Sequence, residues 1–229
     1  MRGEEPLVLK RSDAYIGVLI DDLVTKGTSE PYRMMTARAE YRLLLRQDNA
    51  DARLTEMGRR VGLVTDERYD AYMRKREAVE KEKARLYACS VDVEKANKVL
   101  AAKGQQTLTA PVKAAALLTR QGISYADLKD ICGADAPDDV ALCVETEIRY
   151  AGYIEKQKRQ VERFAGMEKK KLPAGFDYHQ IKGLRLEAAA KLTAMQPETL
   201  GQAMRISGVS PADISVLVVY FNSLKEQTG

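Results

Sequence analysis

The feature that most limits how this chain can fold is a densely charged segment, residues 66–88, with apolar residues at helical spacing. Its apolar members are Tyr69, Tyr72, Met73, Val79 and Leu86. A narrow apolar seam among charges predicts a solvated α-helix that packs along one side. Further helices are predicted over residues 91–103, from 109 to about 122, from 124 to 131, from 140 to about 166 and from 212 to about 224. The chain is therefore expected to be mainly α, with two helical subdomains.

The breaks between these segments predict three parts. Residues 1–35 are interpreted as an extended or loop connection, in which Pro6 to Leu9 reads as a short extended segment and Tyr15 to Ile20 fits either a strand or a short helix. Residues 36–165 form a helical subdomain, with the helix from residue 140 as a long joining helix. Residues 166–229 form a small helical module that follows a lysine, proline and glycine break.

Arginines are concentrated between residues 33 and 46. They are Arg33, Arg38, Arg42 and Arg46, and the last three recur every four residues, which would place them along one side of a helix. Each guanidinium offers a planar fork to phosphate oxygens, so a row of them predicts contact with a phosphate backbone. An ordinary amphipathic helix, with Glu40 and other acids as ion-pair partners, fits the same pattern.

The charge is unevenly distributed along a chain whose net charge is only +4. Residues 32–60 carry seven arginines and four acids, and residues 155–171 carry seven lysines and arginines and three acids. Two separate basic regions on a nearly balanced chain indicate a patterned footprint for an anionic polymer.

Two segments of the C-terminal module share a pattern of apolar residue, any residue, glycine, apolar residue and then a helix. They are residues 181–184 and 206–209. Similar turns open helix-hairpin-helix units and offer backbone amides to phosphate, but one glycine between two apolar residues is common in any helical hairpin, so plain helix packing is the preferred interpretation. The last predicted helix is apolar at Ile214, Leu217, Val218, Val219, Tyr220 and Phe221. This face is wider than one packing seam needs, so part of it is expected to meet a partner protein.

No catalytic or metal-binding constellation is found. Cys89, Cys132 and Cys143 are widely spaced and odd in number, which indicates reduced structural thiols, and the single histidine, His179, has no neighbouring ligand. No glycine-rich phosphate loop is present. No apolar run approaches the ~20 residues of a membrane helix, and the N-terminus lacks the apolar core of a signal peptide. A soluble, cytoplasmic binding module without its own enzyme activity is expected.

Several stretches resemble one known family. Residues 13–28 read DAYIGVLIDDLVTKGT and residues 38–51 read RAEYRLLLRQDNAD, with further matches over 150–154 and 200–209. On these residues the chain resembles the C-terminal part of the tRNA-modifying flavoproteins MnmG, also called GidA. Departures from the family pattern stand at Met35, Ala37, Arg185 and Ser210, and among these only Arg185 changes charge.

The resemblance implies that the whole enzyme acts with the GTPase MnmE. Together they would add an aminomethyl or carboxymethylaminomethyl group to carbon 5 of the tRNA wobble uridine, with FAD, NADH and a folate-borne one-carbon unit. The FAD-binding domain is expected to precede Met1, the parent is expected to be a homodimer, and the chain itself is expected to hold no cofactor or metal.

Two roles are predicted for the chain from the residue patterns and the resemblance together. tRNA contact is predicted at Lys26, Arg33, Arg38, Arg42, Arg46 and Arg53. Docking of the GTPase is predicted at Arg205, Gly208, Val209, Ile214, Leu217, Tyr220 and Phe221. The alternatives are a protein-interaction module with little RNA contact and an autonomous module like a helix-hairpin-helix that binds nucleic acid.

Overall fold

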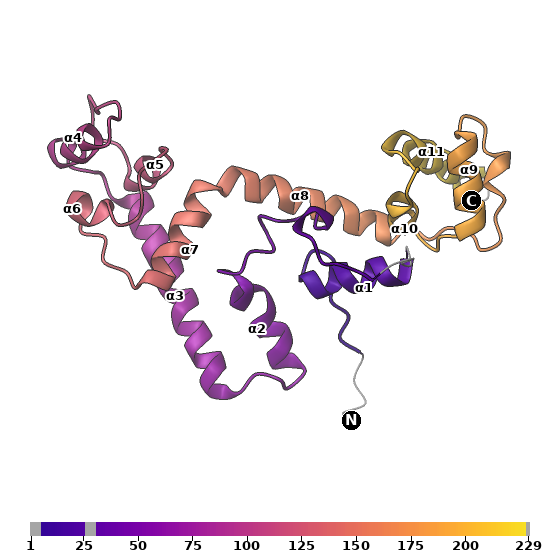
Figure 1. Ribbon diagram of the computed structural model, residues 1–229, viewed down its shortest axis with the longest axis horizontal. Helices are drawn as coiled ribbons and strands as arrows, with labels where there is room; N and C mark the ends of the chain where they lie inside the picture. Colours follow the sequence, from indigo (N-terminus) through magenta and orange to yellow (C-terminus); the bar gives the residue numbers. More distant parts are fainter. Residues whose placement is uncertain (1–5, 26–30, 228–229) are drawn as a thin grey trace. The chain divides into compact units, whose positions relative to one another are not determined.

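The computed structural model describes residues 6–25 and 31–227, and these residues form mainly α-helices (Figure 1). The elements in chain order are α1 (Tyr15–Thr25), the 3₁₀ helix η1 (Thr36–Arg38), α2 (Ala50–Arg60), α3 (Asp66–Ala88), α4 (Val93–Ala102), α5 (Ala114–Leu118), α6 (Leu128–Cys132), α7 (Asp138–Arg149), α8 (Ala151–Glu168), the 3₁₀ helix η2 (Tyr178–Gln180), α9 (Leu186–Met195), α10 (Leu200–Arg205) and α11 (Pro211–Gln227). The prediction of a mainly α fold is confirmed. Over the described ranges no strand forms, and residues 6–10 are neither helix nor strand.

The described residues divide into two compact units. The first unit comprises residues 6–15 and 39–157, and the second comprises residues 16–25, 31–38 and 158–227. The predicted boundaries between parts, at residues 35 and 165, stay a prediction. The segment from Tyr15, for which strand and helix were both possible, forms helix α1.

Helix α3 organises the first unit, since it packs against α2, α5 and α7 (Figure 1). It begins where the Thr65 hydroxyl oxygen accepts a hydrogen bond from the Arg68 N–H, and acids fill its first turn, where they suit the helix dipole. Tyr72, Val79 and Leu86 recur every seven residues and are buried, so the predicted helix is confirmed with these three residues as its seam, whereas Tyr69 is half-buried and Met73 is exposed. The core of the unit includes the fully buried side chains of Leu86, Leu100, Leu117, Leu118, Ile123, Leu128 and Val144.

The single long helix predicted from residue 140 to about 166 is wrong at one residue. Helix α7 ends at Arg149 and α8 begins at Ala151, while Tyr150 between them has φ −104° and ψ 14°. The Tyr150 N–H still donates to the Thr146 carbonyl at 3.0 Å, and the Tyr150 carbonyl accepts from the Ile154 N–H at 2.8 Å. Hydrogen bonding therefore continues across the junction, although the helical dihedral angles do not.

The helix predicted from Arg33 to Arg46 does not form. Its residues adopt η1 followed by turns, in which the Leu44 and Leu45 N–H groups both donate to the Tyr41 carbonyl at 2.9 Å. The buried side chains here are Ala39, Tyr41 and Leu45, a spacing that does not place them on one helical stripe. The arginines therefore do not lie along one side of a helix.

The second unit has its own core, formed around the C-terminal helices. Tyr178, Leu192, Ala203 and Leu217 are fully buried there. Both predicted glycine turns form: Gly183 has φ +89° ahead of α9, and Gly208 has φ +94° ahead of α11. Positive φ angles of this size favour glycine, which explains its place in both repeats.

Candidate nucleic-acid interface

The residues predicted to contact tRNA in the arginine-rich segment have different surroundings. Lys26 lies outside the described residues. Arg33 and Arg38 belong to the second unit and are exposed, and the Arg38 guanidinium lies 4.7 Å from the centroid of the Tyr32 ring, at cation–π distance. Arg42 belongs to the first unit and is also exposed. These three exposed arginines have donors that can reach solvent or a ligand.

Arg46 is bound within the chain. Its Nε lies 3.0 Å from Asp48 Oδ1, its Nη2 lies 3.1 Å from Asp48 Oδ2, and its Nη1 donates to the Leu43 carbonyl at 2.6 Å. The side chain is 13% exposed. A bidentate contact with a carboxylate satisfies most of the donors and balances the charge.

Arg53 is also directed inward. Its Nε donates to Asn49 Oδ1 at 3.0 Å and its Nη2 donates to the Arg46 carbonyl at 2.9 Å. Its Nη1 donates to the Asp13 carbonyl. Burial, and next the charge of Arg46, lower the pKa of Arg53, although a guanidinium stays protonated at neutral pH. Arg46 and Arg53 thus supply hydrogen bonds to the turns that replace the predicted helix.

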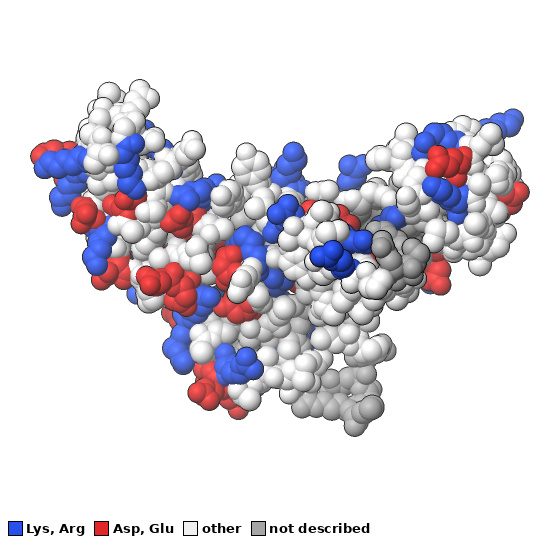
Figure 2. Space-filling view, viewed as in Figure 1, with Lys and Arg blue, Asp and Glu red and all other residues white. Residues whose placement is uncertain are grey.

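A second set of cations lies between residues 158 and 171, in the second unit. It consists of Lys158, Arg159, Arg163, Lys169, Lys170 and Lys171, which are all exposed. We call this set the 158–171 basic segment. Its only acids are Glu162 and Glu168. Along the upper edge of Figure 2, the charged side chains that project above the position of α8 are blue.

The backbone at the end of the 158–171 basic segment is held in place. The Leu172 N–H donates to the Glu198 carbonyl at 2.8 Å, and the Leu200 N–H donates to the Lys170 carbonyl at 3.0 Å. Between these bonds Lys171 and Thr199 form a β-bridge. Three adjacent lysines are therefore presented from an ordered backbone. In the sequence, the local excess of positive charge indicates this region, but it does not single out these three lysines.

The acid next to these lysines is engaged elsewhere in the second unit. Glu168 forms an ion pair with Arg205, and its Oε2 accepts a hydrogen bond from Thr199 Oγ1 at 3.0 Å. Arg205, a predicted docking residue, also lies 3.0 Å from Asp21 through its Nε, and its side chain is only 15% exposed. Arg205 thus links three helices of the unit and diverts Glu168 from the neighbouring lysines.

The other predicted docking residues occupy both the core and the surface of the C-terminal module. Ile214 and Leu217 are 3% and 0% exposed, so the prediction that they bind a partner is wrong for the folded module. Both side chains belong to the core of this unit, where α11 packs against α10. Tyr220 and Phe221 are half-buried, with ring centroids 6.0 and 5.2 Å from that of Phe176. The apolar width of α11 is thus explained largely by its core and this aromatic cluster.

The turn at Gly208 has its own carboxylate at the start of α11. The buried Asp213 accepts hydrogen bonds from the Ser210 N–H and hydroxyl, both at 2.7 Å, and the Asp213 N–H donates to Ser210 Oγ. Arg185 Nε lies 3.0 Å from Asp213 Oδ1, and this contact holds the pKa of Asp213 well below its usual range. The capping box satisfies the amides that a phosphate would need, which favours plain packing at this turn.

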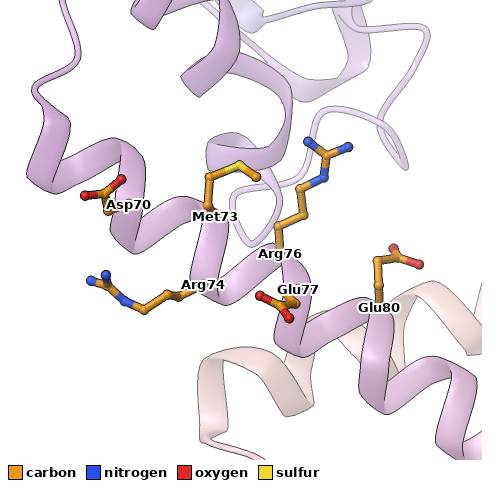
Figure 3. A pocket seen from close by; sticks show the side chains of 6 residues that line it. All are labelled: Asp70, Met73, Arg74, Arg76, Glu77 and Glu80. Carbon is orange, nitrogen blue, oxygen red and sulfur yellow. The ribbon is translucent and has the colours of Figure 1, made fainter.

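A hollow on the surface of α3 shows no arrangement for catalysis. Figure 3 shows the side chains that line it, which come from this one helix: Asp70, Met73, Arg74, Arg76, Glu77 and Glu80. Arg76 Nη1 is 3.4 Å from Glu56 Oε1. Three acids and two arginines line the hollow, so most of their charge compensates. Over residues 6–25 and 31–227, no cluster of three or more histidines, cysteines or acids has the arrangement of a metal site. Among the helices that the structure describes, none has the length and apolar character needed to cross a membrane.

Two family models match most of the chain. Residues 66–158 match the tRNA modifying enzyme MnmG/GidA C-terminal helical domain, and residues 160–229 match the MnmG/GidA C-terminal helical bundle. The boundary between the two matches falls within α8.

Relatives and solved structures agree with these matches. The tRNA uridine 5-carboxymethylaminomethyl modification enzyme MnmG of Caldicellulosiruptor saccharolyticus is 52% identical over 99% of this chain and 37% of its own length. The enzyme of the same name from Heliobacterium modesticaldum is 54% identical over 96% of this chain and 36% of its own length. The form II crystal structure of Aquifex aeolicus GidA is 39% identical, with a TM-score of 0.71, over 95% of this chain and 34% of that one. The chain thus spans a little over a third of the relatives it matches.

Proposed function

Because the chain belongs to the MnmG/GidA family of tRNA-modifying enzymes, we propose that it supplies tRNA contact for an enzyme that modifies carbon 5 of the wobble uridine. The contact is to phosphates, through cations that the fold leaves exposed. The same proposal covers the whole enzyme. It would add a carboxymethylaminomethyl or aminomethyl group with MnmE as its partner and with FAD and NADH as cofactors. It would act in the cytoplasm as a homodimer.

The observation that carries the proposal is the 158–171 basic segment. It presents six exposed cations from α8 and from the ordered backbone beside it, while Arg205 and Thr199 engage Glu168. Ammonium and guanidinium groups close to phosphates displace condensed counterions, which gives binding that weakens as salt rises. Exposed Arg33, Arg38 and Arg42 are proposed as further phosphate contacts, and Lys26 stays a prediction.

The described residues do not fit a flavin or nicotinamide dinucleotide. A dinucleotide fold holds its pyrophosphate with a strand, a glycine-rich turn and a helix N-terminus. Within residues 6–25 and 31–227 there is no strand to begin such a unit. We therefore assign no residue of this chain to FAD or NADH and no chemical step that passes through them.

Docking of the GTPase is proposed for the outer surface of the C-terminal module. Val219 is 69% exposed on α11 and Leu186 is 81% exposed on α9, so apolar surface is available there although Ile214 and Leu217 are buried. Sedimentation of the chain with MnmE tests this second proposal.

The tRNA proposal is tested with the variant Lys169→Gln, Lys170→Gln, Lys171→Gln. Fluorescence titration of the chain with tRNA, repeated at several salt concentrations, gives the affinity and the slope of log K against log salt. We expect the affinity at low salt to fall by roughly tenfold or more, and the slope to become shallower by about two to three, because about 0.9 counterion is released for each phosphate neutralised.

A matched control changes three exposed lysines of the first unit: Lys81→Gln, Lys95→Gln, Lys98→Gln. The net charge falls by the same amount in both variants, so non-specific attraction is lowered equally. A larger loss of affinity in the 169–171 variant supports the proposal. Equal losses, or an unchanged salt slope, would contradict it.

A further inference from the structure

Two large aromatic side chains are exposed where α7 passes into α8 in the first unit. Tyr150 is 39% exposed and Tyr153 is 65% exposed. The Tyr150 N–H donates to the Thr146 carbonyl, and the Tyr150 carbonyl accepts from the Ile154 N–H, so hydrogen bonds four residues apart continue through this junction. Residues three apart in such a turn are neighbours on its surface. The two phenol rings therefore occupy adjoining exposed positions.

The fold of the described residues makes no specific use of these two side chains. Neither hydroxyl forms a hydrogen bond with another described residue, and neither ring lies against a second ring or a guanidinium there. Tyr69 of the same unit differs, because its hydroxyl lies 3.2 Å from Glu56 Oε2 and the Arg59 guanidinium lies 5.3 Å from its ring centroid. Tyr150 and Tyr153 thus remain available to a ligand.

The surface beside the two rings is open. Ala151 and Gly152, which separate them in the chain, are both exposed. A methyl group on Gly152 would meet no heavy atom within 4 Å outside its own stretch of helix. A flat ligand can therefore approach the rings without meeting a bulky side chain between them.

The residues that follow the tyrosines suit a nucleic acid better than a protein partner. Residues 151–160 carry three cations and one acid, and Lys156 is exposed three residues after Tyr153. Among residues 150–160, all of which the structure describes, no aliphatic side chain larger than alanine is exposed, since Ile154 is half-buried. Aromatic rings with cations nearby are the combination that binds single-stranded nucleic acid.

We propose that Tyr150 and Tyr153 form a stacking site for unpaired nucleobases of RNA. This inference rests on the proposed tRNA function and adds base contacts to the phosphate contacts. The face of a base is open to an aromatic ring only where the base is not stacked within a duplex. The wobble uridine belongs to the unpaired anticodon loop of tRNA, so the site favours the part of the substrate that is modified.

The test compares two double variants of the full chain: Tyr150→Phe with Tyr153→Phe, and Tyr150→Leu with Tyr153→Leu. Both keep a large apolar side chain at each position, and leucine is the better helix former, so a helix-propensity loss in the Leu variant is not expected. Fluorescence titration uses a labelled hairpin RNA with an unpaired loop and an RNA duplex of the same length. We expect the Phe variant to bind the hairpin like the unmodified chain and the Leu variant to bind it about tenfold more weakly, with equal duplex affinities in all three, because leucine has no π-face.

The salt dependence separates this inference from the proposed function. The Leu variant loses no phosphate contact, so its slope of log K against log salt is expected to stay unchanged, whereas the 169–171 variant becomes shallower. Equal hairpin affinities in the Leu and Phe variants, with the lysine effect still present, would overturn the stacking site alone. A surface for a protein partner would give that result, since leucine keeps the apolar area. A chain that binds neither RNA would overturn both proposals.

A second measurement locates the contact directly in the unmodified chain. A hairpin with 5-iodouridine in its loop is irradiated in the complex, which cross-links the base to an aromatic ring stacked on it, and peptide mapping identifies the residue. We expect cross-links at Tyr150 or Tyr153. Cross-links found only at other residues would overturn the proposal, whatever the folding of the variants.

Discussion

The two basic regions of the molecule have similar charge in the sequence and use it differently in the structure. Between residues 32 and 60, Arg46 and Arg53 direct their guanidiniums to Asp48, to Asn49 and to backbone carbonyls. Between residues 158 and 171, the lysines and arginines are exposed. The regions therefore differ in that the first uses two of its arginines for hydrogen bonds within the fold.

This difference has a simple physical basis. A regular helix satisfies its own interior carbonyls, so cations on its surface extend into solvent, as on α8. A segment of turns leaves carbonyls without helical partners, and a guanidinium with five donors can serve several of them at once. Arginines within irregular backbone are therefore more readily used for folding than cations on a helix.

The largest expected effect is the loss of stability when Arg53 is replaced by leucine. Its three contacts, to Asp13, Arg46 and Asn49, hold the start of the first unit against α2. Without them, part-buried carbonyls lose their donor, so the free energy of unfolding is expected to fall by about 2–3 kcal/mol. Urea denaturation followed by circular dichroism measures this change.

The matched control for Arg53 is Arg42→Leu, which removes the same charge from an exposed position of the same unit. Its effect on stability is expected to lie within about 0.5 kcal/mol of zero. Similar losses in the two variants would show that Arg53 does not have the structural role assigned to it.

The next effect concerns Asp213, because it shows that the second unit also uses an arginine internally. The Arg185 contact and the Ser210 donors stabilise the buried carboxylate. Asp213→Asn keeps the size of the side chain but removes its charge, and is expected to lower stability at pH 7 by roughly 2 kcal/mol. Urea denaturation of both proteins over a range of pH measures the difference.

The pH dependence of that difference has a definite sign. The pKa of Asp213 is lower in the folded chain than the value of about 3.9 expected when unfolded, so the unfolded state binds the proton first. The stabilisation is complete above about pH 4 to 5 and is lost as the pH falls toward the folded pKa. The gap between the two proteins should therefore narrow on acidification; a gap that widens would exclude this role for Asp213.

The sequence was sufficient where local signals agreed with each other. The seam of α3, the glycine turns before α9 and α11, and the acids at the start of α7 all favour the structure that forms. Family membership was likewise predictable, because long stretches of specific residues carried the resemblance, and the two family models bear it out.

The structure of the arginine-rich segment, in contrast, could not be predicted from the sequence. Its four-residue spacing of arginines is what a helix would show, but the segment forms turns in which Ala39, Tyr41 and Leu45 are buried, and no local pattern in the sequence indicates that choice. The acceptors of Arg53 include the carbonyl of Asp13, forty positions away. Backbone carbonyls have no signature in a sequence, so contacts of this kind become visible only once the fold is known.

The smallest effect separates the two uses of arginine within one unit. Arg42→Gln removes an exposed cation, so the slope of log K against log salt for tRNA is expected to become shallower by about one, with stability nearly unchanged. Arg46→Gln breaks the pair with Asp48 and is expected to lower stability by about 1 kcal/mol, with the salt slope unchanged. Titration and denaturation of the same two variants give both quantities. If Arg46→Gln changed the slope as much as Arg42→Gln, the guanidinium of Arg46 would have to leave Asp48 when RNA binds, and the contrast between the two basic regions would fail.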